Sequence, residues 1–172
     1  MVESKFCKES FVVKTSNVFP PDTNYHGTLF GGKLMGYIDD VASIAATRHS
    51  RSAVVTASTD SVDFLHPIHV GSSVCLEAYV TYTGRSSMEV FVKVIAENLI
   101  SGERNMCAIS FLTFVALDEN GKPKQVPTVV PQSDEEKMLH QSAKDRAETR
   151  KKRKKENEKM AQLFSVALPW EI

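Results

Sequence analysis

One long helical pattern, followed by a run of strand patterns, constrains most strongly how this chain can fold. Between Lys33 and about His49, apolar residues recur at three- and four-residue spacing, and no Pro or Gly follows Gly36. After this segment, up to about residue 117, apolar and polar residues alternate as they do in strands. One helix followed by several long strands predicts an α+β fold, in which an antiparallel sheet packs on that helix.

Five segments carry the strand pattern, a short one before the helix and four long ones after it. Their expected bounds are residues 10–15, 54–64, 74–82, 88–95 and 106–117. Turn residues separate them, at His66-Pro67, at Thr83 to Ser86 and at Asn98 to Asn105, and the segment from Asp118 to Pro123 closes the sheet.

The last quarter of the chain has a different composition. Residues 133–160 contain no Pro or Gly and are highly charged, which indicates a long solvated helix or a partly disordered segment. Ser133 followed by three acidic residues is typical of a helix N-terminus. We therefore divide the 172 residues into one domain over 1–131 and a charged helical tail over 132–172. One hypothesis is that the tail helix is an assembly or membrane-surface element.

The charges of the two parts differ in sign, although the whole chain has 21 basic and 21 acidic side chains. Residues 1–132 hold 11 basic and 13 acidic side chains, a net charge of −2, and residues 133–172 hold 10 and 8, a net charge of +2. Six consecutive bases run from Arg150 to Lys155. Acidic residues surround this run and few aromatic residues interleave it, so we expect a solvated helix face and no nucleic-acid binding.

Composition also excludes several classes of protein. No apolar stretch approaches the ~18 residues of a membrane-spanning helix, so we expect no membrane insertion. The polar start from Met1 to Lys5 has no apolar signal core behind it, which predicts a cytosolic location. An odd number of cysteines, Cys7, Cys75 and Cys107, with no C-x-x-C pair argues against a disulfide framework and a zinc site.

Two short patterns resemble catalytic or metal-binding motifs without meeting their requirements, and a third motif is absent. Gly27 to Lys33 matches the start of a phosphate-binding loop, but Leu34 stands where Ser or Thr would hold magnesium. Pro67 prevents a helix that would bring His66 and His69 together, and no third ligand is near, so we expect no metal site. No G-x-S-x-G sequence occurs, which gives no support for a serine hydrolase.

Residues 24–40 carry the functional signal. On a helical wheel Asp39 falls at the edge of the apolar arc, next to Met35 and Ala42, whereas Asp40 falls on the solvated side. Partial desolvation tends to raise the pKa of a carboxyl group and makes it a better base. The alternative is an aspartate that caps the helix or pairs with a neighbouring group.

Two glycines at the helix entry, Gly31 and Gly32, expose the first backbone N–H groups of the helix. These donors lack internal partners and lie at the positive end of the helix dipole, so they suit a developing oxyanion. The glycines also allow a tight turn into the helix, and both interpretations are compatible.

The distance between these two features has a consequence for assembly. Asp39 follows Gly31 by eight residues, which places it ~12 Å further along the helix at ~1.5 Å per residue. One carbonyl carbon cannot contact both groups of the same chain. If both act on one substrate, two subunits must share the site.

At these residues the sequence closely resembles the cytosolic acyl-CoA thioester hydrolases of the hotdog fold. The matching segments occur in order over about residues 9–131: Asn24-x-x-Gly27-x-x-Phe30-Gly31-Gly32, Ile38-Asp39, Val55-Thr56-Ala57-Ser58, Val62-Asp63-Phe64-x-x-Pro67-Ile68-x-x-Gly71, Gly84-Arg85-Ser86-Ser87-Met88-Glu89-Val90 and Phe114-Val115-Ala116-Leu117-Asp118. Family members often carry Trp where this chain has Tyr37.

The resemblance implies a hotdog fold, with a five- to six-stranded antiparallel sheet wrapped around the helix of residues 33–49. It implies hydrolysis of acyl-CoA to a fatty acid and free CoA, with no metal or redox cofactor because a thioester is already activated. It also implies a homo-oligomer in which a dimer is the smallest active unit and active sites lie at its interface. Bacterial members resemble trimers of such dimers, so we expect a hexamer.

The resemblance assigns roles to individual residues. Asp39 is expected to be the general base or a direct nucleophile, Gly31 and Gly32 to bind the thioester oxygen, and Asn24 of the other subunit to position water or the carbonyl group. Ser43 is expected to orient the Asp39 carboxylate beside the substrate. Arg85, Ser86 and Ser87 form a basic, hydroxylated turn suited to CoA phosphates, with a plain surface turn as the alternative. The alternative function is a non-catalytic hotdog module that binds acyl-CoA as a regulatory ligand.

Overall fold

The computed structural model describes residues 3–168 and residue 170; Met1 and Val2, part of the polar start that predicts location, lie outside this range. The elements in chain order are β1 (Ser4–Phe6), the 3₁₀ helix η1 (Cys7–Ser10), β2 (Val12–Asn17), the 3₁₀ helix η2 (Pro20–Asp22), α1 (Gly31–Ser50), β3 (Ala53–Phe64), β4 (Ser73–Thr83), β5 (Ser87–Glu97), β6 (Arg104–Leu117), β7 (Thr128–Val130) and α2 (Asp134–Ala161).

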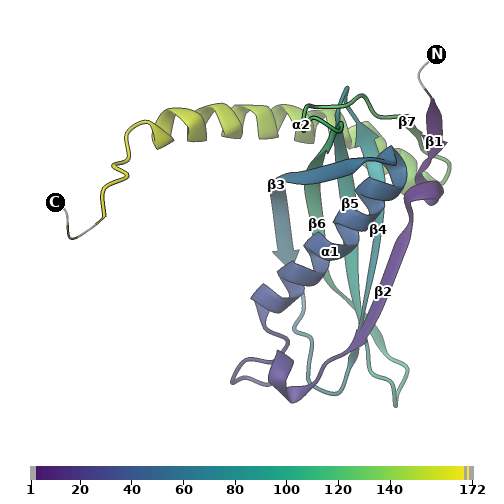
Figure 1. The fold of residues 1–172 in the computed structure, drawn as a ribbon. Coiled ribbons are helices and arrows are strands. Elements are labelled where there is room, and N and C mark those ends of the chain that lie inside the picture. Colours follow the sequence, from purple (N-terminus) through teal and green to yellow (C-terminus); the bar gives the residue numbers. More distant parts are fainter. Residues whose placement is uncertain (1–2, 169, 171–172) are drawn as a thin grey trace.

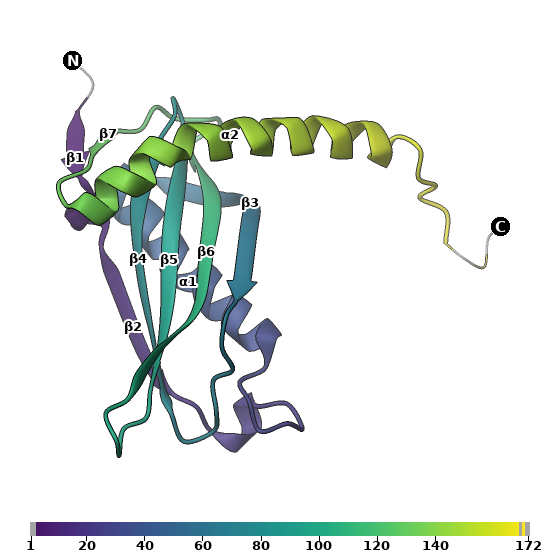
Figure 2. The ribbon, with the colours of Figure 1, turned by 180° about the vertical axis from the view of Figure 1, so that it is seen from behind.

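Five strands form one antiparallel sheet in the order β2-β4-β5-β6-β3, so β2 and β3 are its edges. The two helices lie on opposite faces of this sheet, as the two views in Figures 1 and 2 show. Strands β1 and β7 pair in parallel beside it. The predicted α+β fold, with a sheet around one long helix and a charged helical tail, is confirmed.

Helix α1 is the apolar centre of the domain. Its buried side chains recur at helical spacing and pack against the sheet: Leu34, Ile38, Val41, Ala42, Ala45 and Ala46. The helix begins at Gly31, two residues before the predicted start, so both glycines belong to its first turn. It ends where Arg51 takes a left-handed conformation, with φ of 51°. Met35, predicted within the apolar arc, is 48% exposed.

Helix α2 crosses the outer face of the sheet, the face opposite α1 (Figure 2). It begins with the predicted cap, in which the Ser133 hydroxyl accepts the Glu136 N–H and the Glu136 carboxylate accepts the Ser133 N–H. The expected division between domain and tail falls in the link between β7 and α2. In the described part of the chain, no helix is long and apolar enough to cross a membrane.

A buried ion pair attaches the middle of α2 to the sheet. The Glu89 side chain on β5 is almost fully buried, and Arg146 donates to its two oxygens at 3.0 and 2.7 Å. The Thr81 hydroxyl donates to the same carboxylate at 2.9 Å, and the guanidinium lies 4.1 Å from the centre of the Phe111 ring. The buried carboxylate is therefore fully paired, as a charge in the interior must be.

The next turns of α2 are held to the edge strand β3. Arg150 and Arg153 contact the Asp60 carboxylate at 3.1 and 2.6 Å, and Arg153 also donates to the Asp60 carbonyl and the Ser58 hydroxyl. These two arginines belong to the six-residue basic run, whose four lysines are exposed. The run is thus partly an anchor and partly the predicted solvated face.

Replacing Arg146 by Ala would leave the Glu89 carboxylate buried without its charge partner. We expect the Arg146→Ala variant to lose about 3–5 kcal/mol of unfolding free energy, measured by urea denaturation. The control Lys144→Ala removes an exposed charge from the same helix and should change this free energy by less than about 0.5 kcal/mol. Equal stabilities of the two variants would contradict the role of the ion pair.

Candidate functional site

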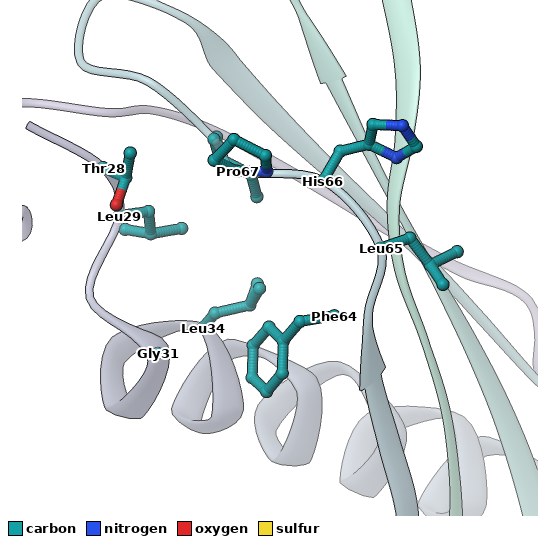
Figure 3. A pocket seen from close by; sticks show the side chains of 9 residues that line it. Thr28, Leu29, Gly31, Leu34, Phe64, Leu65, His66 and Pro67 are labelled. Atoms are coloured by element: carbon teal, nitrogen blue, oxygen red, sulfur yellow. The ribbon is translucent and has the colours of Figure 1, made fainter.

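A cavity of about 350 Å³ lies at the N-terminus of α1, between the first turn of the helix and the segment that follows β3 (Figure 3). The Phe64 ring stands beside the first turns of α1, close to Leu34 (Figure 3). The lining is mostly apolar and consists of Thr28, Leu29, Gly31, Leu34, Phe64, Leu65, His66, Pro67 and Ile68. Such a lining suits an acyl group better than a charged one.

The first two N–H groups of α1 are available to a ligand. Among the described residues, neither Gly31 nor Gly32 donates a backbone hydrogen bond. The first N–H groups of a helix have no partner within it, because the helix has no preceding turn whose carbonyls could accept them. A Cβ atom on Gly32 would lie 2.6 Å from a ring carbon of Phe30, so this position requires glycine while the ring stays in place. A Cβ atom on Gly31 would meet Phe64 at an ordinary 3.8 Å, so packing alone does not require glycine there.

Asn24 organises the loop that leads to this helix start. Its amide nitrogen donates to the Thr28 hydroxyl at 3.0 Å, and its amide oxygen accepts the N–H of His26 at 2.9 Å. Gly27 takes a left-handed φ of +72° within the same turn. An asparagine amide carries two hydrogens, so one donor of the half-buried Asn24 remains for a ligand.

Asp39 lies two turns further along α1 and is exposed in the single chain. The helical wheel predicts a partly buried Asp39 carboxylate, but its own chain does not bury it. The Thr56 hydroxyl on β3 donates to the Asp39 carboxylate at 3.0 Å. The cavity beside Gly31 does not include Asp39 among its lining residues, so one chain keeps the two features apart, as the helical spacing predicts.

Ser43 does not have the contact expected of it. Its hydroxyl donates to the backbone carbonyl of Asp40 at 2.8 Å, which is the usual bond of a serine to its own helix. The hydroxyl that orients Asp39 comes instead from Thr56, 17 residues away on a neighbouring strand. Helical spacing could not identify Thr56, although it stands in one of the segments that resemble the family.

Ion pairs attach the surrounding elements to α1. Lys33 pairs with Asp22 at 3.3 Å, and this hydrogen bond raises the pKa of the Lys33 ammonium group. Lys14 on β2 pairs with Asp40. Both lysines also lie against the ring of Tyr37, at 4.8 Å for Lys14 and 5.4 Å for Lys33. The aspartate next to Asp39 is thus occupied by a structural pair.

The turn of Arg85, Ser86 and Ser87 joins β4 to β5, far from the Gly31 cavity of the same chain. Ser87 is paired with Val115 on β6, which is paired with Val55 on β3. The turn therefore lies about two strand spacings, or ~10 Å, from the part of β3 that carries Thr56. Arg85 is exposed, and its carbonyl accepts the N–H of Val126.

Other reactive side chains are occupied or protonated. His66 Nδ1 lies 3.1 Å from the carbonyl oxygen of Met106. Burial raises the pKa of the Cys7 thiol to about 12 and also raises that of Cys107, so neither is a thiolate near neutral pH. Within the described ranges, no three His, Cys, Asp or Glu side chains gather in a way that could hold a metal ion.

Comparison with known proteins finds relatives over nearly the whole chain. The family model described as the thioesterase superfamily matches residues 26–102. YkhA of Bacillus subtilis (strain 168), named an uncharacterized acyl-CoA thioester hydrolase, is 64% identical over 168 residues, which covers 98% of this chain and 98% of YkhA.

Solved structures of similar proteins share the fold. An apo-hexameric acyl-CoA thioesterase has a TM-score of 0.87 and 53% identity, covering 88% of this chain and 97% of that chain. An acyl-CoA hydrolase from Staphylococcus aureus, in complex with butyryl coenzyme A, coenzyme A and coenzyme A disulfide, has a TM-score of 0.90 and 47% identity, covering 93% and 98%. Other structures of the S. aureus hydrolase carry alanine in place of an aspartate, a threonine or an asparagine.

The contact between Thr56 and Asp39 generates a direct prediction. Thr56→Val keeps the shape of the side chain but removes the hydroxyl that holds the carboxylate, so kcat for acyl-CoA hydrolysis should fall by up to ~10²-fold, with a smaller change in KM. Ser43→Ala is the matched control and should retain kcat, because its hydroxyl contacts only the helix backbone. A larger loss in Ser43→Ala than in Thr56→Val would contradict this assignment.

Proposed function

Because this chain belongs to the thioesterase superfamily, we propose that it is an acyl-CoA thioesterase, which hydrolyses acyl-CoA to a fatty acid and free CoA. One observation carries the mechanism. Helix α1 presents free N–H groups at its start and, two turns later, a carboxylate held by Thr56. A thioester hydrolase needs both of these parts, a donor for the oxyanion and a base or nucleophile.

Asp39 activates the attack on the thioester carbonyl. As a general base it takes a proton from water while the water oxygen bonds to the carbonyl carbon, and the C–S bond then breaks. The proton passes to the departing sulfur, so the products are a carboxylic acid and the CoA thiol. The alternative is direct attack by the carboxylate, which forms an anhydride that water cleaves. The Thr56 hydrogen bond orients the carboxylate for either route.

The N–H of Gly31, together with that of Gly32, donates a hydrogen bond to the carbonyl oxygen and stabilises the negative charge that develops there. Backbone donors at a helix start are already oriented and need no rearrangement during the reaction. The remaining amide hydrogen of Asn24 lies on the loop that precedes these glycines and is suited to position water or the carbonyl group.

Two copies of the chain supply the two halves of each site. β3 is an edge strand, so its outer backbone groups can pair with another strand. If two β3 strands pair antiparallel, the start of one lies beside the end of the other. Thr56 lies near the start of β3 and Phe64 at its end, so this pairing brings Asp39 of one copy towards the Gly31 cavity of the other.

In this dimer, the Arg85 turn and Asp39 of one chain contribute to the same active site. Ser87 and Val55 are both paired with Val115 of β6, and Val55 precedes Thr56, whose hydroxyl contacts Asp39. An exposed guanidinium with two neighbouring hydroxyl groups suits the phosphates of CoA. We assign Arg85, Ser86 and Ser87 this role.

The relatives support these assignments. The substituted asparagine, aspartate and threonine of the S. aureus hydrolase are 15 and 17 residues apart, the same spacing as Asn24, Asp39 and Thr56 here. That hydrolase binds CoA, and another relative is a hexamer. We therefore propose acyl-CoA as the substrate, a dimer as the smallest active unit and a trimer of dimers as the assembly.

The proposed reaction uses no metal or redox cofactor, because a thioester carbonyl is reactive enough for attack by activated water. The cytosolic location expected from the sequence stays a prediction.

Substitution of Asp39 tests this function. Asp39→Asn keeps the shape of the side chain but removes its basicity, so CoA release should fall by ~10²–10⁴-fold, and Asn24→Ala should cost a comparable or smaller factor. The measurement is thiol release from acyl-CoAs of several chain lengths. Asp40→Asn is the matched control, because Asp40 pairs with Lys14 and should not contact substrate.

Equal rates for Asp39→Asn and the wild type would contradict the assignment of Asp39. Tight binding of acyl-CoA by the wild type without any CoA release would contradict the enzyme itself and support a regulatory binding module.

A further inference from the structure

Helix α2 leads the chain past the edge of its own sheet. Its contacts move in order from strand to strand, with His140 on β4, Arg146 on β5 and Arg153 on β3. β3 is the last strand, yet α2 continues for eight more residues to Ala161, a further ~12 Å. Figures 1 and 2 show this end of α2 projecting beyond β3, with no strand of its own sheet beneath it.

The segment at this projecting end is apolar and exposed. Exposed fractions reach 83% for Leu163, 67% for Phe164, 100% for Val166 and 78% for Trp170. From Arg150 to Lys159 the helix that precedes this segment is charged at nine of ten positions, so the apolar group stands apart from its surroundings. A cluster of exposed aromatic and aliphatic side chains marks an interaction site.

We propose that residues 160–168 and Trp170 of one chain pack on the outer sheet face of a second copy. The inference rests on the proposed function, because it uses the β3-to-β3 pairing of the shared site. In that dimer, the sheet of the other copy continues from the edge strand β3, so the projecting end of α2 lies over that second sheet. A projection of ~12 Å crosses about two strands at ~4.8 Å each, so the apolar segment reaches past β3 of the other copy to its β6.

A groove of about 530 Å³ lies on this outer face, between α2 and the sheet. Ala57, Thr113 and Val115 form part of its floor, and Lys154 and Asn157 form part of its wall. In its own chain the apolar segment leads away from this groove (Figure 2). Each copy of a symmetric dimer can therefore insert its apolar segment into the groove of the other, where an aromatic side chain can bury ~150–250 Å².

Charge acts on the helix before the apolar segment and not on the segment itself. Residues 133–172 have a net charge of +2 and residues 1–132 a net charge of −2, so α2 of one copy and the body of the other attract each other. Residues 160–168 carry no charged side chain, so burial of apolar surface is what favours their insertion into the groove.

Trp170 is the only tryptophan of the chain and reports directly on this contact. In the assembled wild type we expect blue-shifted emission and quenching by acrylamide several-fold weaker than for free tryptophan. Dilution until the subunits separate should shift the emission to the red. Phe164→Asp in the segment and Val115→Lys in the groove should each cause this red shift without dilution, whereas the control Phe164→Leu should not.

Each other outcome overturns the proposal. Emission like that of free tryptophan in the assembled protein means that the segment is uncovered. A blue shift that survives dilution to single subunits means that it packs on its own chain. A blue shift that appears only with vesicles of anionic phospholipid means that it binds a membrane surface. Phe164 is exposed, so Phe164→Asp should fold even if Val115→Lys does not, and circular dichroism checks both.

Thiol release from acyl-CoA, measured on the same wild-type samples, separates this inference from the proposed function. Full release with an exposed Trp170 overturns only the docking of the segment. A buried Trp170 without any release overturns only the thioesterase.

Discussion

The rigid spacing along α1 is the constraint on which the rest of the structure depends. The free N–H groups at Gly31 and the carboxylate of Asp39 stand eight residues apart on one straight element, ~12 Å from each other. No side-chain movement brings both to one carbonyl carbon. The exposed Asp39, the apolar cavity beside Gly31 and the open edge of β3 are the features that the proposed shared site requires of each chain. In the proposed dimer, a second copy completes the site without any change in the fold.

Features with a strong periodic signal could be predicted from the sequence. The helical spacing of α1 follows from burial on one face, and the predicted bounds of α1 and of the four long strands lie within a few residues of the observed ones. The three-residue strands β1 and β7 are too short to show alternation, and they form only because distant segments meet. Met35 fits the helical pattern, but no sheet residue covers it, so it stays exposed.

In the candidate site, too, local features could be predicted from the sequence, whereas contacts between distant residues could not. The residue types around Asp39 and Gly31 suggest their chemistry, and the family resemblance suggests that of Asn24. The structure adds the hydrogen bonds of Asn24 and Asp39. Thr56 could not be assigned a role, because its contact with Asp39 joins a helix to a strand 17 residues away. Ser43 is expected from the resemblance to orient Asp39, yet its hydroxyl donates to its own helix backbone. The basic run also makes contacts that its sequence does not indicate, because Arg150 and Arg153 pair with Asp60 on β3, far away in the chain.

Subunit mixing tests the shared site most directly. Asn24→Ala and Asp39→Asn subunits, each almost inactive alone, are unfolded together and refolded as a mixture. Half of the dimers are then mixed, and each mixed dimer holds one intact site of two, so the account predicts recovery of about a quarter of wild-type CoA release. Activity no greater than the sum of the two separate variants, in a sample that has refolded and exchanged subunits, would contradict a site built from two chains.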